Sequence, residues 1–307
     1  MTASFLSSIL GINAVYAQSF EYPMEPIQVA QNTWYIEAVR ESFTPQNGGA
    51  IANIAFVRDD DRVLVIDSGP SKRFGQQLRQ LIVATTGQEP TDLLLTHHHP
   101  DHSLGNQAFA DINIWALKET ATQLKAEGNA FAESLYLMVG DWMRGTEILA
   151  PNKVIEAGKM FSDSDRFEVI ALKGHTGADL LLLDRESRVL FASDMIFFQR
   201  ALATPHTPGL DVWLADINYL RTLPFDQVIP GHGPVTSKSE ALDQMEAYLR
   251  WLDRLLSESA LQGLTMNELR NAEIPAEFNS IALTRYELTR TIAHLYPNYE
   301  LKAFSKK

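Results

Sequence analysis

The sequence predicts an α/β fold in which a strand-rich body is followed by a helical tail. Short apolar runs alternate with polar loops from about residue 27 to residue 235. Beyond that point the apolar residues recur at helical spacing. The chain has 307 residues, which is enough for one large domain with a sizeable core. We therefore expect a sheet-containing domain that carries the chemistry and a C-terminal extension of helices.

The first elements are predicted to be strands. Residues 34–36, 51–57 and 63–66 are rich in β-branched and aromatic side chains, which is typical of strands. The polar stretch 58–61 between two of them indicates a hairpin turn. Residues 74–85 then predict a helix, because Leu78, Leu81 and Ile82 fall on one helical face.

The middle of the chain predicts a second set of strands. A short buried strand is expected at 93–95, and further strands at 112–115, 167–172, 180–183, 189–192 and 227–229. The pair Gly128-Asn129 predicts a break, with a helix following over 130–139.

The tail carries helix start signals. Ser237 and Glu240 have the spacing of a capping box, and Thr265 and Glu268 repeat it. A third helix is expected over 281–295, ending before Pro297.

Composition narrows the classes of function. The formal net charge is −12 and no cluster of Lys and Arg occurs, so nucleic acid is not expected as a partner. The chain has no cysteine, which excludes disulfides and thiolate metal ligands and leaves the compartment open.

The first 17 residues predict a signal peptide. Residues 5–16 are mostly apolar or small, and Val15-Tyr16-Ala17 resembles a cleavage site, although no Lys or Arg precedes Arg40. The expected location is therefore periplasmic or secreted, and cytoplasmic if the segment is retained. No other segment has about 18 uninterrupted apolar residues, so membrane insertion after cleavage is not expected.

A dense run of histidines carries the strongest chemical signal. Thr96 to His102 reads T-H-H-H-P-D-H and directly follows the apolar stretch 93–95. Imidazole nitrogens and carboxylate oxygens suit zinc and similar divalent ions. A solvated histidine-rich loop is the alternative, but a cluster at the exit of a buried strand favours a metal site.

Three further polar residues follow predicted strands. His175 lies in G-H-T-G after 167–172, Asp194 lies in A-S-D after 189–192, and His232 lies in P-G-H-G after 227–229. Each alone is more often structural than a ligand. Strand ends that lie side by side in one sheet converge, so together these residues indicate one site.

The series H-x-H-x-D-H, G-H-T, S-D and G-H-G, in this order, resembles the metallo-β-lactamase superfamily over about residues 53–233. The resemblance implies an αββα four-layer sandwich. Together with the residue patterns above, the expected organisation is a signal peptide at 1–17, a catalytic domain at 18–236, and a helical C-terminal extension at 237–307 packed on it.

The resemblance also implies a ligand set for two Zn²⁺ ions per chain, with iron or manganese as alternatives. Three histidines would hold the first ion, Asp101 and two histidines the second, and Asp194 would bridge them; His98 would point away. Asp67, in V-I-D-S-G, would lie beneath the ions and orient ligands. The full set is His97, His99, Asp101, His102, His175, Asp194 and His232.

Departures from the relatives narrow the group. Asp194 stands where thiol-bearing β-lactamases carry Cys, and His99 stands where di-iron relatives carry Glu. The pattern therefore looks like glyoxalase II. The segment 200–233 looks most like the SoxH-like group, called quinoprotein relay system zinc metallohydrolases. That likeness implies a link to quinoprotein dehydrogenase metabolism.

The implied reaction is hydrolysis of an ester, thioester or amide of a small-molecule substrate. A hydroxide shared by two dications would attack the carbonyl, and Asp101 would steer a proton. A β-lactam or lactone hydrolase is the alternative. A nuclease of the same fold is opposed by the acidic charge. A di-iron redox protein or a non-catalytic metal-binding protein is the alternative of another class.

Several residues outside this set are left with two interpretations. His206 either lines the substrate pocket or lies on a surface loop. Tyr136, Trp142 and Met143 are more often core residues than a cover over the site. His294 is expected to be structural.

Overall fold

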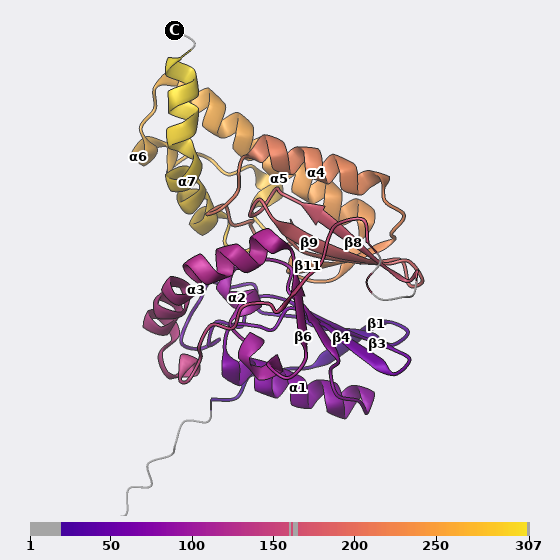
Figure 1. Cartoon of the computed structure of the whole chain (residues 1–307). Coiled ribbons are helices and arrows are strands. Elements are labelled where there is room, and N and C mark those ends of the chain that lie inside the picture. The colour runs from indigo at the N-terminus through magenta and orange to yellow at the C-terminus, as the bar shows by residue number, and fades with distance from the viewer. Residues whose placement is uncertain (1–19, 160, 162–164, 306–307) are drawn as a thin grey trace, which may run out of the picture.

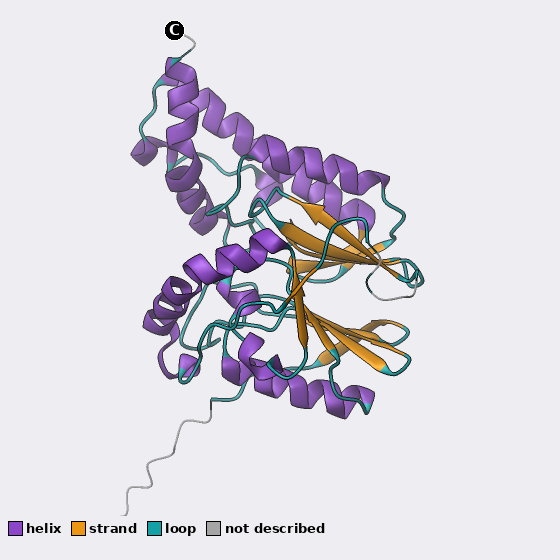
Figure 2. Ribbon diagram, in the orientation of Figure 1, coloured by secondary structure: helices purple, strands orange, loops and turns teal. Residues whose placement is uncertain are grey.

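The computed structural model describes residues 20–159, 161 and 165–305. The expected signal peptide at 1–17 lies outside these residues. Two β-sheets face each other, and helices cover the outer face of each (Figures 1 and 2). None of the helices in the described part of the chain is both long and apolar enough to span a bilayer.

The first sheet contains seven strands in sequence order. The first four pair antiparallel, and β4 onward pair parallel. The strands are β1 Pro26–Ala30, β2 Thr33–Ile36, β3 Ile54–Asp59, β4 Arg62–Ile66, β5 Asp92–Leu94, β6 Asn113–Ala116 and β7 Lys153–Val154. Arg58 and Asp59 thus still belong to β3, and the predicted hairpin turn contracts to Asp60 and Asp61.

The second sheet contains five strands in the order β12-β11-β10-β9-β8. Its one parallel pair in the described chain is β10 with β11. The strands are β8 Phe167–Leu172, β9 Asp179–Asp184, β10 Val189–Phe197, β11 Gln227–His232 and β12 Thr236–Ser237.

The helices fall into two sets. The first set, on the side of the first sheet, is α1 Lys72–Thr86, α2 Pro100–Ser103, the 3-10 turn η1 Asn106–Phe109, α3 Lys118–Val139 and η2 Gly140–Met143. The second set is α4 Leu210–Thr222, α5 Lys238–Gln262, α6 Met266–Leu269, η3 Ala276–Phe278 and α7 Thr284–Phe304. Both predicted capping boxes are present, at the starts of α5 and α6.

The strand sequences explain why both faces of each sheet are covered. Along β4, Val63 and Val65 pack under the first set of helices, whereas Leu64 and Ile66 face the other sheet. Along β9 the same alternation places Leu180 and Leu182 between the sheets and the intervening leucines under α4 and α5. Because side chains alternate across a strand, continuous apolar runs bury both faces. The four-layer αββα sandwich with C-terminal helices is therefore confirmed.

The predicted break at Gly128 is wrong. α3 runs without interruption through this residue, which is buried. A Cβ at position 128 would lie 2.7 Å from Cγ2 of Ile148. The glycine is therefore there for close packing against the segment after η2, and not for a turn.

The predicted end of the last helix before Pro297 is also wrong, because α7 continues to Phe304 with Pro297 inside it. Contacts to α5 and its end anchor the helix on both sides of the proline. Tyr296 donates a hydrogen bond to Leu264 O at 2.6 Å, and Tyr299 donates one to Asp253 Oδ1 at 2.6 Å. Tertiary packing therefore outweighs the cost of the missing N–H.

Candidate metal centre

The histidine run leaves the first sheet directly after β5. Its N-terminal part is extended, and its C-terminal part forms the single turn α2, which begins at Pro100. This geometry turns His97 and His99 to one side and places Asp101 and His102 one turn further along. All four side chains are buried.

Asp194 comes from the second sheet, and from inside a strand and not after one as predicted. β10 continues to Phe197, and its register with β11 shifts on either side of Ser193. Ser193 has φ 45°, so a bulge redirects the next side chain. A Cβ on Gly231 of β11 would collide with Oδ1 of Asp194, so only glycine leaves room for this carboxylate.

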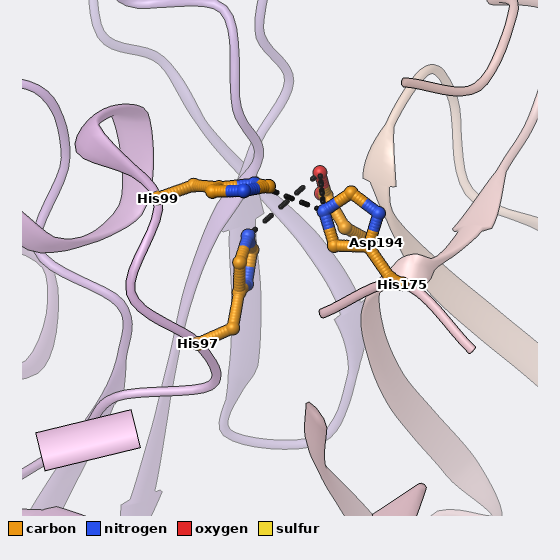
Figure 3. A group of neighbouring side chains, drawn as sticks. All are labelled: His97, His99, His175 and Asp194. Atoms are coloured by element: carbon orange, nitrogen blue, oxygen red, sulfur yellow. Dashed lines mark hydrogen bonds and ion pairs between the residues drawn. The ribbon is translucent and has the colours of Figure 1, made fainter. Parts of the chain in front are cut away.

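The first group consists of His97, His99, His175 and Asp194. Nε2 of His175 lies 3.0 Å from Nδ1 of His99 and 3.2 Å from Oδ2 of Asp194. Nε2 of His97 lies 3.9 Å from the same oxygen. The three rings and the carboxylate point toward one another (Figure 3).

The second group consists of Asp101, His102 and His232. Nε2 of His102 lies 3.1 Å, and Nε2 of His232 lies 3.3 Å, from the other oxygen of Asp194, Oδ1. Asp101 Oδ2 is 3.5 Å from Nε2 of His232. Asp194 thus stands between the two groups, with one oxygen toward each. All seven predicted ligand residues are brought together.

Asp67 lies under the histidine run and fixes it. Its carboxylate accepts hydrogen bonds from the backbone N and Oγ1 of Thr96, both at 2.8 Å. Nδ1 of His102 lies 2.7 Å from Asp67 Oδ2. With Nδ1 of His102 bonded to Asp67, its Nε2 is the nitrogen that faces Asp194.

Burial keeps two of the rings neutral. It lowers the pKa of His97 and that of His99 well below the usual value, and the neighbouring imidazoles add to the effect. Neutral imidazole is the form that binds metal ions.

His102 and Asp194 each favour the charged form of the other. Burial acts to lower the pKa of His102, but the surrounding carboxylates, Asp194 foremost, outweigh it and raise that pKa well above the usual value. Burial acts to raise the pKa of Asp194, but the imidazoles around it, His232 foremost, hold that pKa well below its usual range.

The chemistry of this set fits a bound cation. Nε2 of His97, Nε2 of His102 and Oδ1 of Asp194 are buried and have no hydrogen-bond partner among the described residues. Unpaired buried polar atoms are costly. Two ligands about 2.05 Å from zinc at the tetrahedral angle lie about 3.3 Å apart, close to the separations within each group.

A third group adjoins the first. Nδ1 of His206 lies 2.7 Å from Nε2 of His99, and Nε2 of His206 lies 3.2 Å from Oε2 of Glu127 on α3. His98 lies beside them, with its Nε2 3.6 Å from the same oxygen. His206 is half-buried and lines the pocket over the site. Of its two interpretations, a pocket-lining residue or a surface-loop residue, the structure therefore favours the first.

The pocket over the two groups has a volume of about 190 Å³. Sequence reasoning missed much of its lining: Phe43, Phe131, Met138, Arg200, Tyr286 and Arg290. Phe131, Leu135 and Met138 follow one face of a helix, a spacing that was available in the sequence.

Trp142 and Met143 are core residues as expected, whereas Tyr136 is exposed. His294 lies 3.3 Å from Oγ1 of Thr204.

Two known proteins are similar in sequence to part of this chain. The acyl-coenzyme A thioesterase MBLAC2 of Gallus gallus is 29% identical over 178 residues, which is 48% of this chain and 59% of the relative. The beta-lactamase-like protein 2 homolog of Caenorhabditis elegans is 24% identical over 168 residues, 55% of this chain and 50% of the relative. The chain thus spans between 50% and 59% of the length of these relatives.

Solved structures show the same fold. The metallo-beta-lactamase FIM-1 from Pseudomonas aeruginosa, in its mono-zinc form, superposes with a TM-score of 0.62 and 16% identity, covering 76% of this chain and 98% of that one. The metallo-beta-lactamase from Hirschia baltica gives a TM-score of 0.60 at 16% identity, with 74% and 98% covered. The family model of the metallo-beta-lactamase superfamily matches residues 47–232. Because this match covers more than half of the chain, the chain belongs to the metallo-beta-lactamase superfamily.

Proposed function

We propose that this protein is a metal-dependent hydrolase that cleaves an ester, thioester or amide bond of a small molecule. The observation that carries the proposal is the position of Asp194, whose two oxygens face two separate groups of buried ligand atoms. The centre would hold two zinc ions, one in each group. The likeness to an acyl-coenzyme A thioesterase supports a thioester as the first substrate to try.

When bound, the ions would lower the pKa of a shared water to about 7 and polarise a carbonyl oxygen. The chain's own part is to fix seven ligands, to orient the substrate and to move a proton. Asp101 lines the pocket and lies within reach of His232, so it is placed to take up a proton during the reaction. The apolar lining, with Phe131 and Met138, would hold the acyl part and exclude water.

The test begins with elemental analysis of the purified protein. We expect about two zinc ions per chain and hydrolysis of thioesters, esters or lactones that a chelator abolishes and added zinc restores. Asp194→Asn should lose both metal and activity, whereas Asp111→Asn, an exposed carboxylate paired with Arg79, should keep both. Chelator-resistant hydrolysis, or metal without turnover on any substrate including β-lactams, would contradict the proposal. Iron in place of zinc would favour a redox protein.

We also propose a metabolic role and a location for this hydrolase. The likeness of segment 200–233 to SoxH-like hydrolases supports a link to quinoprotein dehydrogenase metabolism. The composition of residues 1–17 supports export to the periplasm. The mass of the mature chain after expression with its N-terminus intact tests the second, because cleavage after Ala17 removes 17 residues.

A further inference from the structure

One side of the active-site pocket is built from the C-terminal helix. Tyr286 and Arg290 of α7 line the same pocket as His99 and Asp194, together with Arg200, which follows β10. The superfamily match ends at residue 232, so α7 lies outside it. The pocket wall therefore includes side chains from the C-terminal extension, outside the region that the family model matches.

This wall carries two guanidinium groups and one carboxylate. Glu287 is 1% exposed and pairs with Nη2 of Arg200 at 3.0 Å and with Nη1 of Arg290 at 3.2 Å. The side chain of Arg200 is only 4% exposed. Because two cations share one anion, a net positive charge remains at the wall of this pocket, in a chain whose overall charge is −12.

Both arginines keep unused hydrogen-bond donors. Nη1 of Arg200 donates to Ala201 O at 2.7 Å, but its Nε is buried without a partner among the described residues. Within the same residues Arg290 forms hydrogen bonds through Nη1 alone, and its side chain is 41% exposed. Unsatisfied donors on charged groups favour an anionic ligand.

The position of the arginines is fixed by the backbone. Arg200 pairs with Ala282, just before α7, in an isolated β-bridge. Ala201 N donates to Ala282 O at 2.9 Å, and Ala282 N donates to Gln199 O at 3.0 Å. The loop after β10 and the start of α7 are thereby held together, so the charged wall is in place before any ligand binds.

The remaining lining sets the shape of the ligand. Apolar side chains, among them Phe43, Ile51 and Phe131, line the pocket together with the metal centre and the arginines. In the described part of the chain, the carboxylates that line it, Asp101 and Asp194, belong to the candidate metal centre. Among the described residues, Arg200 and Arg290 are the Arg or Lys side chains that line the pocket, and no carboxylate outside the metal centre lines it to repel an anion.

We propose that Arg290 and Arg200 form an anion subsite and that the substrate is an acyl compound with an apolar middle and a carboxylate or phosphate group. This inference rests on the proposed hydrolase function. Guanidinium binds both anions through paired N–H donors, so the chemistry is shared and the experiment separates them.

The experiment compares matched thioesters of one small thiol. ω-Carboxyacyl thioesters of three to six carbons are assayed beside the ω-amide and the ω-phosphonate of each length. We expect kcat/KM for an anionic substrate to exceed that for its amide by at least about tenfold, mainly through KM. A larger effect for the phosphonate identifies phosphate as the natural group. Equal rates for anion and amide at every length overturn the proposal.

Variants locate the effect on α7. Arg290→Met should lower kcat/KM for the anionic substrate to the value that the same variant shows for the amide, and Arg290→Lys should retain part of the preference. Arg285→Met, an exposed arginine of the same helix that does not line the pocket, is the matched control. A preference that survives in Arg290→Met at full size contradicts the assignment.

A binding measurement separates failure of the subsite from failure of the hydrolase. Glutarate and glutaramide are titrated into wild-type and Arg290→Met protein, both loaded with zinc, and the thermal midpoint is followed. Binding of glutarate to the metal centre is common to both proteins, so the difference between them reports the subsite. A larger stabilisation of wild type by glutarate alone supports the subsite even without turnover. An equal stabilisation of both proteins overturns it.

Discussion

At the scale of single residues, the hydrogen bond that one ring nitrogen of a histidine makes decides where its other ring nitrogen points. Asp67 bonds Nδ1 of His102 at 2.7 Å and so directs Nε2 toward Asp194. Asp67 also has φ 64°, in the left-handed region that Asp and Asn tolerate better than most residues. Asparagine therefore preserves the backbone but removes the charge and replaces one acceptor oxygen by an NH2 group.

We predict that Asp67→Asn weakens zinc binding by about 10- to 100-fold, because the orienting acceptor of His102 is lost. Competition with a chromophoric chelator measures the affinity. Asp111→Asn serves as the control, since that carboxylate is exposed, pairs with Arg79 and is not one of the candidate ligands. An unchanged affinity in a folded Asp67→Asn protein would show that this carboxylate is merely structural.

His206 and Glu127 orient His99 in the same way as Asp67 orients His102. Nδ1 of His206 is 2.7 Å from Nε2 of His99, and Glu127 bonds the far side of His206. We predict that His206→Phe, which keeps a ring but no nitrogen, lowers zinc affinity about tenfold. His206→Asn should recover part of the loss, because its amide can replace Nδ1. Equal affinities for the two variants would exclude a positioning role.

The sequence contained enough to predict which residues meet, but not the whole pocket. The seven ligand candidates lie near strand ends, so their convergence follows from the sheet. Their roles as ligands remain a prediction until metal is measured. Arg290 was not predictable, because only the tertiary return of α7 brings it to a pocket built about 190 positions earlier, by His99 and its neighbours.

At the scale of elements, local rules failed where tertiary packing opposed them. Gly128 predicted a break, Pro297 predicted a helix end, and the strand before Asp194 appeared to stop at Ala192. In each case a contact from a distant segment decided the outcome. Ile148 lies against Gly128, α5 and the residue after its C-cap hold α7 on both sides of Pro297, and β11 extends β10 past its bulge.

Gly128 gives a test of this interpretation. Alanine is a better helix former than glycine by about 1 kcal/mol, so propensity alone predicts that Gly128→Ala stabilises the protein. The new Cβ would lie 2.7 Å from Ile148, and we predict a loss of about 1 to 3 kcal/mol in the free energy of unfolding. Urea denaturation measures it. The double variant Gly128→Ala/Ile148→Ala should be less affected by the added methyl; a gain in stability for the single variant would contradict the packing argument.

At the scale of the whole molecule, the two sheets must be held together because each contributes part of the metal centre. The apolar layer between them does most of this. One ion network adds to it at the ends of β3 and β9. Arg166 bonds Asp184 of β9 at 2.8 Å and Asp59 of β3, in the first sheet, at 2.7 Å. The side chain of Asp184 is fully buried.

The network predicts a dependence of stability on pH. Burial acts to raise the pKa of Asp184, but the hydrogen bonds from Arg166 and Ser187 outweigh it, so this pKa lies below its usual value. A carboxylate with a lowered folded-state pKa contributes stability above its unfolded pKa of about 4 and loses that contribution as the pH falls through the folded value. Asp184→Asn should therefore cost about 2 to 3 kcal/mol at pH 7, and the difference from wild type should shrink below about pH 4. Urea titrations at pH 7, 5 and 3 measure this.

Asp226→Asn, which removes a fully exposed ion pair with Arg188, should leave the unfolding midpoint nearly unchanged at each pH. A cost for Asp184→Asn that stays constant down to pH 3 would mean that shape and not charge joins the two sheets at the ends of these strands.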